Sequence, residues 1–322
     1  MTTVITVPPS LDESTFESML EGLQGLPDDA KLLLDARHAR WASPFGLTAL
    51  LCVAQARTAL SGERVGFAIP ENPDTLSYWS RTGFFRHAAD LFELHGAVPR
   101  SRDALESSVL LEITPITGID DVHGVVGRIR EKSAAILHGQ LGLDPAVTGL
   151  FGMTLSETCQ NIVEHAGQGG WVAVQTYKYV KRLGRRVVVI AVCDAGLGFR
   201  RSLEMAPNHR ESERWDDAMA LEDAVLRATS RFRHGDKGRG QGLAGVRRFI
   251  GRWHGKLTVR SGTARIAITP EWDEDEPMRE GLAFFPGSQV QIVIPERIGD
   301  AAPKSRTAGA VAGRPRPRER SS

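Results

Sequence analysis

The chain has 322 residues, 41% of them hydrophobic, which is enough to bury a sizeable core and to form about two domains. Its net charge of +1 gives no general attraction for nucleic acid or for an anionic membrane. Cys52, Cys159 and Cys193 are far apart in the sequence and set among apolar neighbours, so they suggest no disulfide framework or metal site and favour a reducing compartment. The N-terminus lacks a secretory signal pattern, and no apolar run reaches the roughly 18 residues of a membrane span, so we expect a cytoplasmic protein.

Residues 1–90 alternate short apolar runs with helical patterns, which predicts a small α/β domain. Strands are expected at VITV (4–7), LLLDA (32–36) and VGFAI (65–69), and helices over residues 11–23, 46–60 and 75–84. The third helix has Asn72 as a cap candidate, followed by the helix-compatible Pro73. Residues 91–117, which include AVPRSRDALESS, are expected to form a linker.

Residues 118–298 predict helices layered on one antiparallel or mixed sheet. The expected helices cover residues 120–141, 145–165 and 242–253, and the expected strands cover 171–180, 185–194, 256–261, 264–270 and 287–295. Residues 200–237 are polar and irregular, and residues 299–322 are expected to form a disordered basic tail.

The helical stretch LSETCQNIVEHAGQGG at 155–170 carries polar residues at four-residue intervals. Glu157, Asn161 and His165 therefore form one stripe of the helix, while apolar residues occupy the opposite side. A carboxylate one turn before an amide can orient a water molecule and hold a hard cation.

The strand RRVVVIAVCD ends in Asp194, and Gly196 and Gly198 follow it. A buried strand that delivers a carboxylate to its end, followed by a glycine turn open to a flat ligand, suits recognition of a donor such as the adenine amino group. One alternative is a plain tight turn in which Asp194 caps the next helix. A second is a dinucleotide-binding βαβ unit, since GLGFRRS resembles its glycine motif, but the segment that follows is typical of a loop.

A second glycine cluster, HGDKGRGQGLAGVRRF, comes directly before a helix. Backbone amides at Gly238, Gly240 and Gly242 form an anion site at the helix N-terminus, and Lys237 and Arg239 add positive charge, so this cluster predicts a phosphate cradle. A flexible loop before a helix is the alternative. No P-loop is present, because GRWHGKLT has the wrong spacing and lacks the hydroxyl residue.

The order of the three motifs, ExxxN, DxGxG and GxGxG, resembles the GHKL ATPase superfamily of DNA gyrase, Hsp90, histidine kinases and MutL over about residues 118–296. The resemblance implies a Bergerat-type α/β sandwich that binds ATP and Mg²⁺. It implies that Asn161 holds Mg²⁺, that Asp194 binds the adenine, and that Gly196 and Gly198 pass close to the base.

The same resemblance implies that Gly238, Gly240 and Gly242 wrap the phosphates, beside Lys237 and Arg239, and that residues 200–237 form a mobile lid. Glu157 lies at the position of the general base in members that hydrolyse ATP or transfer its phosphate. His165 is interpreted as a histidine packed near the helix end rather than as a phosphate contact. His123 lacks the context of a phosphoacceptor histidine, so a sensor histidine kinase is not expected.

The sequence EHAG after the amide and the compact size are most similar to the anti-sigma-factor serine kinases. The segment LLLDARHARWASPFGLTALL resembles the STAS domain of anti-sigma-factor antagonists, in which a serine directly before the glycine accepts phosphate. Here Phe45 occupies that position, Pro44 precedes it, and Ser43 lies three positions before Gly46. A generic βαβ scaffold that docks partners or the neighbouring domain is the alternative interpretation of this segment.

The sequence therefore predicts a Mg²⁺-ATP-binding regulatory protein that couples ATP binding, slow hydrolysis or phosphotransfer to a protein serine to partner binding. An anti-sigma antagonist or a sigma-factor-like regulator is the expected partner; membrane and nucleic acid are not expected as partners. Whether ATP is hydrolysed, transferred or only bound stays open, as does a homodimer. The alternative is a non-catalytic interaction scaffold or an ATP-gated binding switch.

Overall fold

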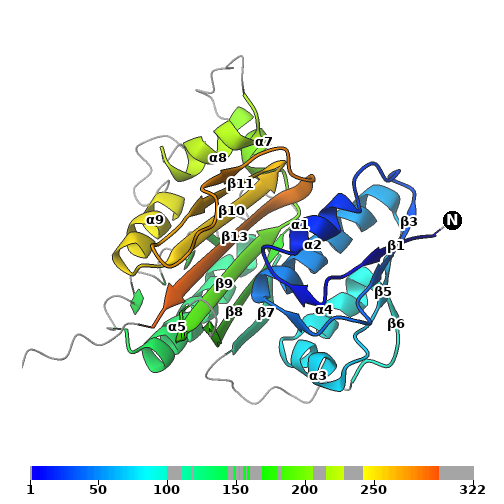
Figure 1. Ribbon diagram of the computed structural model, residues 1–322, viewed down its shortest axis with the longest axis horizontal. Helices are drawn as coiled ribbons and strands as arrows, with labels where there is room; N and C mark the ends of the chain where they lie inside the picture. The colour runs from blue at the N-terminus through cyan, green and yellow to red at the C-terminus, as the bar shows by residue number, and fades with distance from the viewer. Residues whose placement is uncertain are drawn as a thin grey trace, which may run out of the picture.

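The computed structural model describes residues 2–99, 110–117, 119–143, 148–149, 152, 155–156, 158–159, 169–179, 183–205, 215–227 and 242–296. The chain is a mixed α/β protein with two main sheets that lie side by side (Figure 1). One sheet belongs to the N-terminal unit, residues 2–99, and the other begins with the strand that starts at Leu110.

The N-terminal unit has a four-stranded sheet in which all neighbouring strands are parallel. In sheet order its strands are β1 (Thr2–Thr6), β3 (Lys31–Asp35), β5 (Val65–Ala68) and β6 (Phe92–His95), and a separate pair is formed by β2 (Ser10–Leu11) and β4 (Trp41–Ala42). Its helices are α1 (Phe16–Glu21), α2 (Pro44–Ser61), α3 (Pro73–Arg81) and α4 (Phe84–Leu91). The expected cap of the third helix is confirmed, because Asn72 accepts a 2.9 Å hydrogen bond from the Thr75 amide.

The second sheet has seven strands, and all its neighbouring strands are antiparallel. In sheet order they are β12 (Met278–Arg279), β11 (Ala264–Ile268), β10 (Lys256–Gly262), β13 (Phe285–Pro295), β9 (Arg185–Asp194), β8 (Gly170–Tyr179) and β7 (Leu110–Ile116). Because β9 is antiparallel to both neighbours, the glycines after it do not belong to a βαβ unit. The dinucleotide-binding alternative is therefore excluded.

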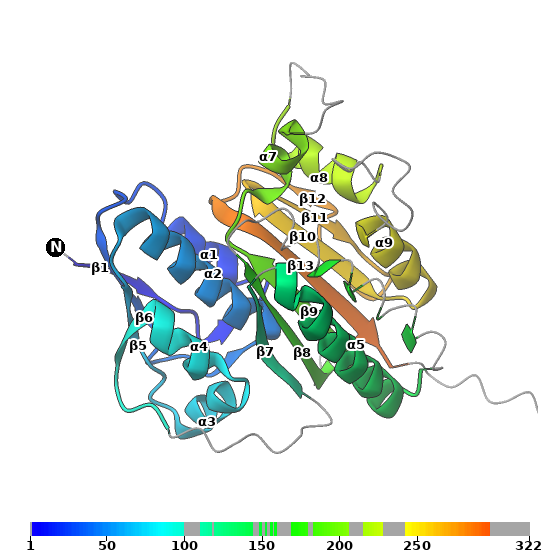
Figure 2. The same cartoon turned by 180° about the vertical axis from the view of Figure 1, so that it is seen from behind.

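Helices cover one face of the seven-stranded sheet (Figure 2). They are α5 (Ile119–Leu141), α7 (Gly198–Glu204), α8 (Asp217–Val225) and α9 (Gly242–Arg252). Between helices and sheet lies an aliphatic core to which the strands contribute alternate residues, such as Val188, Ile190 and Val192 of β9. The expected arrangement of helices layered on one sheet is confirmed in this coarse form.

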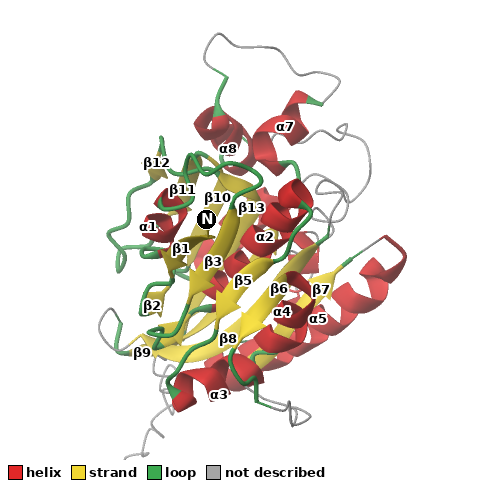
Figure 3. Cartoon of the chain, turned by 90° about the vertical axis from the view of Figure 1, so that its right-hand side faces the viewer, coloured by secondary structure: helices red, strands yellow, loops and turns green. Residues whose placement is uncertain are grey.

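The N-terminal unit packs against the opposite face of the same sheet (Figure 3). Helix α2 contacts β8, β9 and β13, and it also contacts β5 of its own unit. Its residues from Pro44 to Ala54 are all buried, and a helix that is buried all round is a core element rather than a surface helix. The two units thus share α2 between their sheets.

Two expectations about connecting segments need correction. The linker expected at residues 91–117 contains β6 and β7, which are edge strands of the two sheets. The irregular region expected at 200–237 contains most of α7 and all of α8. The basic tail at 299–322 and most of the helix expected over 145–165 lie outside the described residues. In the described part of the chain, no helix combines the length and apolar character needed to cross a bilayer.

Candidate functional site

Strand β9 delivers Asp194 to the end of the seven-stranded sheet, as the sequence predicts. The register places Asp194 between Gly170 of β8 and Ser288 of β13. The near-continuous Val and Ile content of β9 explains why its polar residue lies at the end, because both faces of the strand are covered and only the end can present a polar group.

The carboxylate of Asp194 is almost completely buried, with 4% of the residue exposed. Its Oδ1 accepts a 2.9 Å hydrogen bond from the Gly196 amide, and its Oδ2 accepts one from the Ser288 hydroxyl. Burial raises the pKa of Asp194 to about 6, although the hydrogen bonds from Ser288 and Gly196 act in the opposite direction. A carboxylate held in this way is a preorganised acceptor for a donor that replaces water.

Two glycines beside Asp194, one in the turn that follows it and one in β13, leave no room for a side chain. A Cβ on Gly198, whose φ is +73°, would lie 2.7 Å from Ser261 Oγ and 3.0 Å from the Gly287 oxygen. A Cβ on Gly287, whose φ is +80°, would lie 2.1 Å from the backbone carbonyl oxygen of Asp194. Glycine is therefore required at both positions, by conformation and by close backbone approach.

Ser261 of β10 fastens this turn to the sheet. Its hydroxyl donates to the Gly287 oxygen at 2.8 Å and accepts from the Phe199 amide at 3.0 Å. Ser261 is 3% exposed, so both hydrogen bonds lie in a low-dielectric environment. The backbone around Asp194 is thus fixed by side chains from β10 and β13.

Asp194 does not cap the following helix. Helix α7 begins at Gly198, and its N-cap Leu197 makes no side-chain capping bond. The carboxylate instead bonds the amide of Gly196, two residues on, which is the pattern of a local Asx turn. The capping alternative is therefore wrong.

The other predicted site residues are described only in part. Gly242 is the first residue of α9, as expected for a glycine that opens a helix, and His123 lies in α5. The remaining ones lie outside the described residues: Glu157, Asn161, His165, Lys237, Gly238, Arg239 and Gly240. Within the described part of the chain, no group of three His, Cys, Asp or Glu residues could hold a metal ion.

Sequence reasoning missed Ser288, Gly287 and Ser261. The pair Gly287-Ser288 directly precedes an apolar strand pattern, so a polar residue at a strand start next to a glycine was a usable signal. Ser261 offers no such signal, because its role depends on the pairing of β10 with β13.

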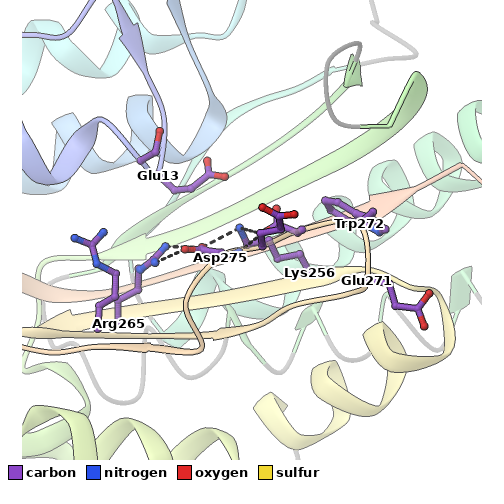
Figure 4. A pocket seen from close by; sticks show the side chains of 10 residues that line it. Glu13, Lys256, Arg265, Glu271, Trp272 and Asp275 are labelled. Carbon is purple, nitrogen blue, oxygen red and sulfur yellow. Dashed lines mark hydrogen bonds and ion pairs between the residues drawn. The ribbon is translucent and has the colours of Figure 1, made fainter.

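A cavity of about 450 Å³ lies elsewhere, between the N-terminal unit and strands β10 and β11 (Figure 4). Its charged groups largely neutralise one another: Lys256 Nζ lies 2.9 Å from both Asp273 and Asp275, and Arg265 pairs with Asp275. Burial alone would raise the pKa of Asp275, but hydrogen bonds from Arg265 and Lys256 lower it to about 2. We interpret this cluster as a structural ion-pair network that is separate from Asp194.

The start of α2, where STAS antagonists carry their phosphoacceptor, is covered by the seven-stranded sheet. Ser43 is 1% exposed and accepts a 3.1 Å hydrogen bond from the Gly46 amide as the N-cap of α2. The carbonyl of Phe45 accepts a 2.8 Å hydrogen bond from Gln289 Nε2 of β13. In this docked arrangement the serine hydroxyl is a structural cap.

Comparison with known proteins does not assign the chain to a family. No protein-family model matches the sequence, and no curated protein matches it either.

Proposed function

We propose that this chain is a Mg²⁺-ATP-binding regulatory protein of the GHKL type, with an N-terminal STAS-like unit. The observation that carries the proposal is the buried carboxylate of Asp194, held at a strand end by Ser288 and Gly196. Among the described residues Asp194 has no cationic partner, and burial of such a carboxylate is costly, so its retention beside a tightly packed glycine turn favours a binding role.

The chemistry of this turn fits an adenine ring. The adenine amino group is a donor, and an ionised carboxylate can only accept. The Ser288 hydroxyl donates its one hydrogen to Asp194 Oδ2 and so holds the carboxylate in place for that amino group. Gly198 and Gly287 allow the close backbone packing that holds the Asp194 turn in position for a ligand.

The order of elements supports the same proposal. Strand β9 and its glycine turn are followed by α7 and α8, and then by α9, which starts at Gly242. The first turn of α9 offers unpaired amides and a positive dipole end, and Lys237 and Arg239 precede it in the sequence. These groups would hold the phosphates, together with Gly238 and Gly240.

Asn161 would hold Mg²⁺, and this ion, when bound, would neutralise charge on the phosphate oxygens. Glu157, one helical turn earlier in the expected helix, would accept the proton of an attacking water or serine hydroxyl. With water as the acceptor the reaction is hydrolysis, and with a protein serine it is phosphotransfer.

The target serine of such a phosphotransfer would lie on a separate protein, because Ser43 is buried as a helix cap. An anti-sigma-factor antagonist or a related regulator fits this role by the resemblance stated above. The N-terminal unit would act from its docked position, since undocking it would expose the buried residues of α2.

Titration with labelled ATP, with and without Mg²⁺, tests the proposal. We expect wild type to bind ATP in a Mg²⁺-dependent way and Asp194→Asn to weaken binding by about tenfold or more, through loss of a charged acceptor. Asp273→Asn is the matched control, because it neutralises a buried carboxylate of the separate ion-pair network. Equal binding by wild type and Asp194→Asn, or no binding by wild type, would contradict the proposal.

Glu157→Gln tests whether the protein is an enzyme that turns ATP over or an ATP-gated binding switch. An enzyme loses turnover in this variant but keeps ATP binding, because the amide retains the volume of the carboxylate and not its basicity. If wild type binds ATP and is as inert as the variant, the enzymatic version is wrong and an ATP-gated binding switch remains.

A non-catalytic scaffold is the second candidate. Helix α2 supports it, since one helix packed between two sheets joins the units into one extended core. A scaffold predicts no Mg²⁺-dependent affinity for ATP, so the same titration decides between the two functions.

A further inference from the structure

Arg260 is a completely buried arginine on β10, with 0% of its side chain exposed. Its Nε and Nη2 donate to the carboxylate of Glu17 in α1 at 2.8 and 3.2 Å. Nη1 donates to the oxygens of Gly262 and Ala264 at 2.5 and 3.3 Å, and Nη2 also donates to the oxygen of Ala283. One guanidinium thus joins the N-terminal unit to the β10–β11 turn and to the segment before β13.

The residues that follow Arg260 contact the candidate site directly. Ser261 bonds the Gly287 oxygen and the Phe199 amide, on either side of the Asp194 turn. Thr263 donates its amide and hydroxyl to the Asp217 carboxylate at the start of α8, at 2.7 and 2.8 Å. Residues 260–263 therefore link α1, the turn after Asp194 and the start of α8.

The backbone hydrogen bonds between β10 and β13 do not by themselves fix the position of residues 260–263. The pairing of β10 with β13 shifts register between Ser261 and Gly262, so the regular hydrogen bonds end where the contacts to the turn begin. The planar fork of Arg260 fixes its acceptors in direction as well as distance. Because a buried charge is strongly destabilised without its counter-ion, the guanidinium follows the position of Glu17.

We propose that Arg260, anchored by Glu17, is a positioning residue through which the docked N-terminal unit sets the geometry of the nucleotide site. Docking of α1 holds Arg260, Arg260 holds the tract that contains Ser261, and Ser261 holds the backbone around Phe199 and Gly287. The N-terminal unit then changes nucleotide affinity without touching the nucleotide. The inference rests on the proposed function for its ligand and on the hydrogen-bond chain for its mechanism.

Glu17→Gln is the primary test, because the amide keeps the size of the side chain and removes the charge that holds Arg260. We expect Mg²⁺-ATP affinity to fall about fivefold to tenfold, at the low end of coupling between distant sites. Asp273→Asn is again the matched control, because it neutralises the carboxylate partner of another buried cation on β10, Lys256. Its ATP affinity should equal that of wild type.

Hydrogen exchange gives a readout that needs no nucleotide. The Phe199 amide is protected by Ser261 Oγ, so its exchange should accelerate in Glu17→Gln and stay unchanged in Asp273→Asn. The Thr75 amide, bonded to the cap Asn72 of α3, serves as the internal reference. Thermal unfolding establishes that each variant is folded at the assay temperature, and Arg260→Lys, which keeps the charge and loses the fork, carries the same test if Glu17→Gln unfolds.

The outcomes separate the inference from the proposed function. Wild type that binds no ATP refutes the proposed function, while faster Phe199 exchange in Glu17→Gln still supports the positioning role. Wild type that binds ATP, with unchanged affinity and unchanged Phe199 exchange in the folded variant, overturns the inference and leaves the proposed function standing.

Discussion

The two faces of the seven-stranded sheet are built from alternate residues of the same strands, yet they differ in chemistry. The helix-covered face is aliphatic on β10 and β13: it has Leu257, Val259, Val290, Ile292 and Ile294. The face against the N-terminal unit is largely polar on these two strands: it has Lys256, Thr258, Arg260, Gln289 and Gln291, all buried, although β13 also contributes Phe285, which packs on Phe16.

On β10 and β13, the aliphatic face therefore contributes hydrophobic stabilisation, and the polar face contributes directional bonds that fix how the N-terminal unit is oriented. Burial of aliphatic surface stabilises in any orientation, because the hydrophobic effect has no direction. Burial of a polar group is costly unless a partner meets it, so the bonds of Arg260 to Glu17 and of Gln289 to Phe45 favour one placement of the N-terminal unit on the sheet.

Arg260→Met should have the largest effect on stability. It leaves the Glu17 carboxylate, 5% exposed, without its cation, and we expect a loss of about 3–5 kcal/mol in the free energy of unfolding. Urea denaturation measures it, and the double variant with Glu17→Gln should recover part of the loss. A loss below about 1 kcal/mol would show that the polar face does not specify docking.

Ile292→Ala probes the aliphatic face. Ile292 is 0% exposed, and its truncation removes buried methyl groups and leaves a cavity, for an expected loss of about 2–5 kcal/mol. Hydrogen exchange at Phe199 should keep its wild-type rate in the folded variant, in contrast to Glu17→Gln. Faster exchange of the Phe199 amide in this variant would show that the aliphatic face also fixes the position of the turn, and would contradict the difference between the two faces.

Asp194→Asn should change how stability depends on pH. Because burial raises the pKa of Asp194 from 3.8 to about 6, the protonated form is favoured in the folded state. Its stabilising contribution is fully present below pH 3.8 and is lost as the pH rises through about 6, for a total of about 3 kcal/mol. Thermal unfolding between pH 4 and pH 7 should therefore show a smaller loss of stability in the variant, and identical profiles would contradict the role of burial.

Gln291→Leu should have the smallest effect and the opposite sign. Among the described residues, neither amide atom of Gln291 has a hydrogen-bond partner, although the residue is only 1% exposed. An apolar side chain of similar volume removes this desolvation cost, so we expect a change between zero and about 1 kcal/mol in favour of the folded state. Destabilisation in a urea titration would indicate that Gln291 does have a partner.

Much of the fold could be predicted from local pattern. The Val- and Ile-rich run from Arg185 to Asp194 and the cap at Asn72 both specify their elements directly. Strand β7 was missed because it contains Pro115, which is tolerated there since β7 lies at the edge of the sheet. Helix α8 was missed because charged residues precede it, although Asp216 is a usable N-cap.

The candidate site was predictable only where its residues are close in sequence. Asp194 and Gly198 belong to one motif, and the structure places them in one turn. The Arg260–Glu17 pair joins residues 243 positions apart, and such a contact cannot be predicted from a local sequence pattern. Register across strands, which also brings Ser288 to Asp194, depends on the whole sheet.

Discrimination between ATP and inosine triphosphate tests the central claim most directly, because the two nucleotides differ at the position that Asp194 would bind. We expect wild type to bind Mg²⁺-ATP about 100-fold more tightly, since the inosine oxygen would face a carboxylate and leave it unpaired. Asp194→Asn should lose most of this preference. Equal affinity of wild type for the two nucleotides would contradict the account.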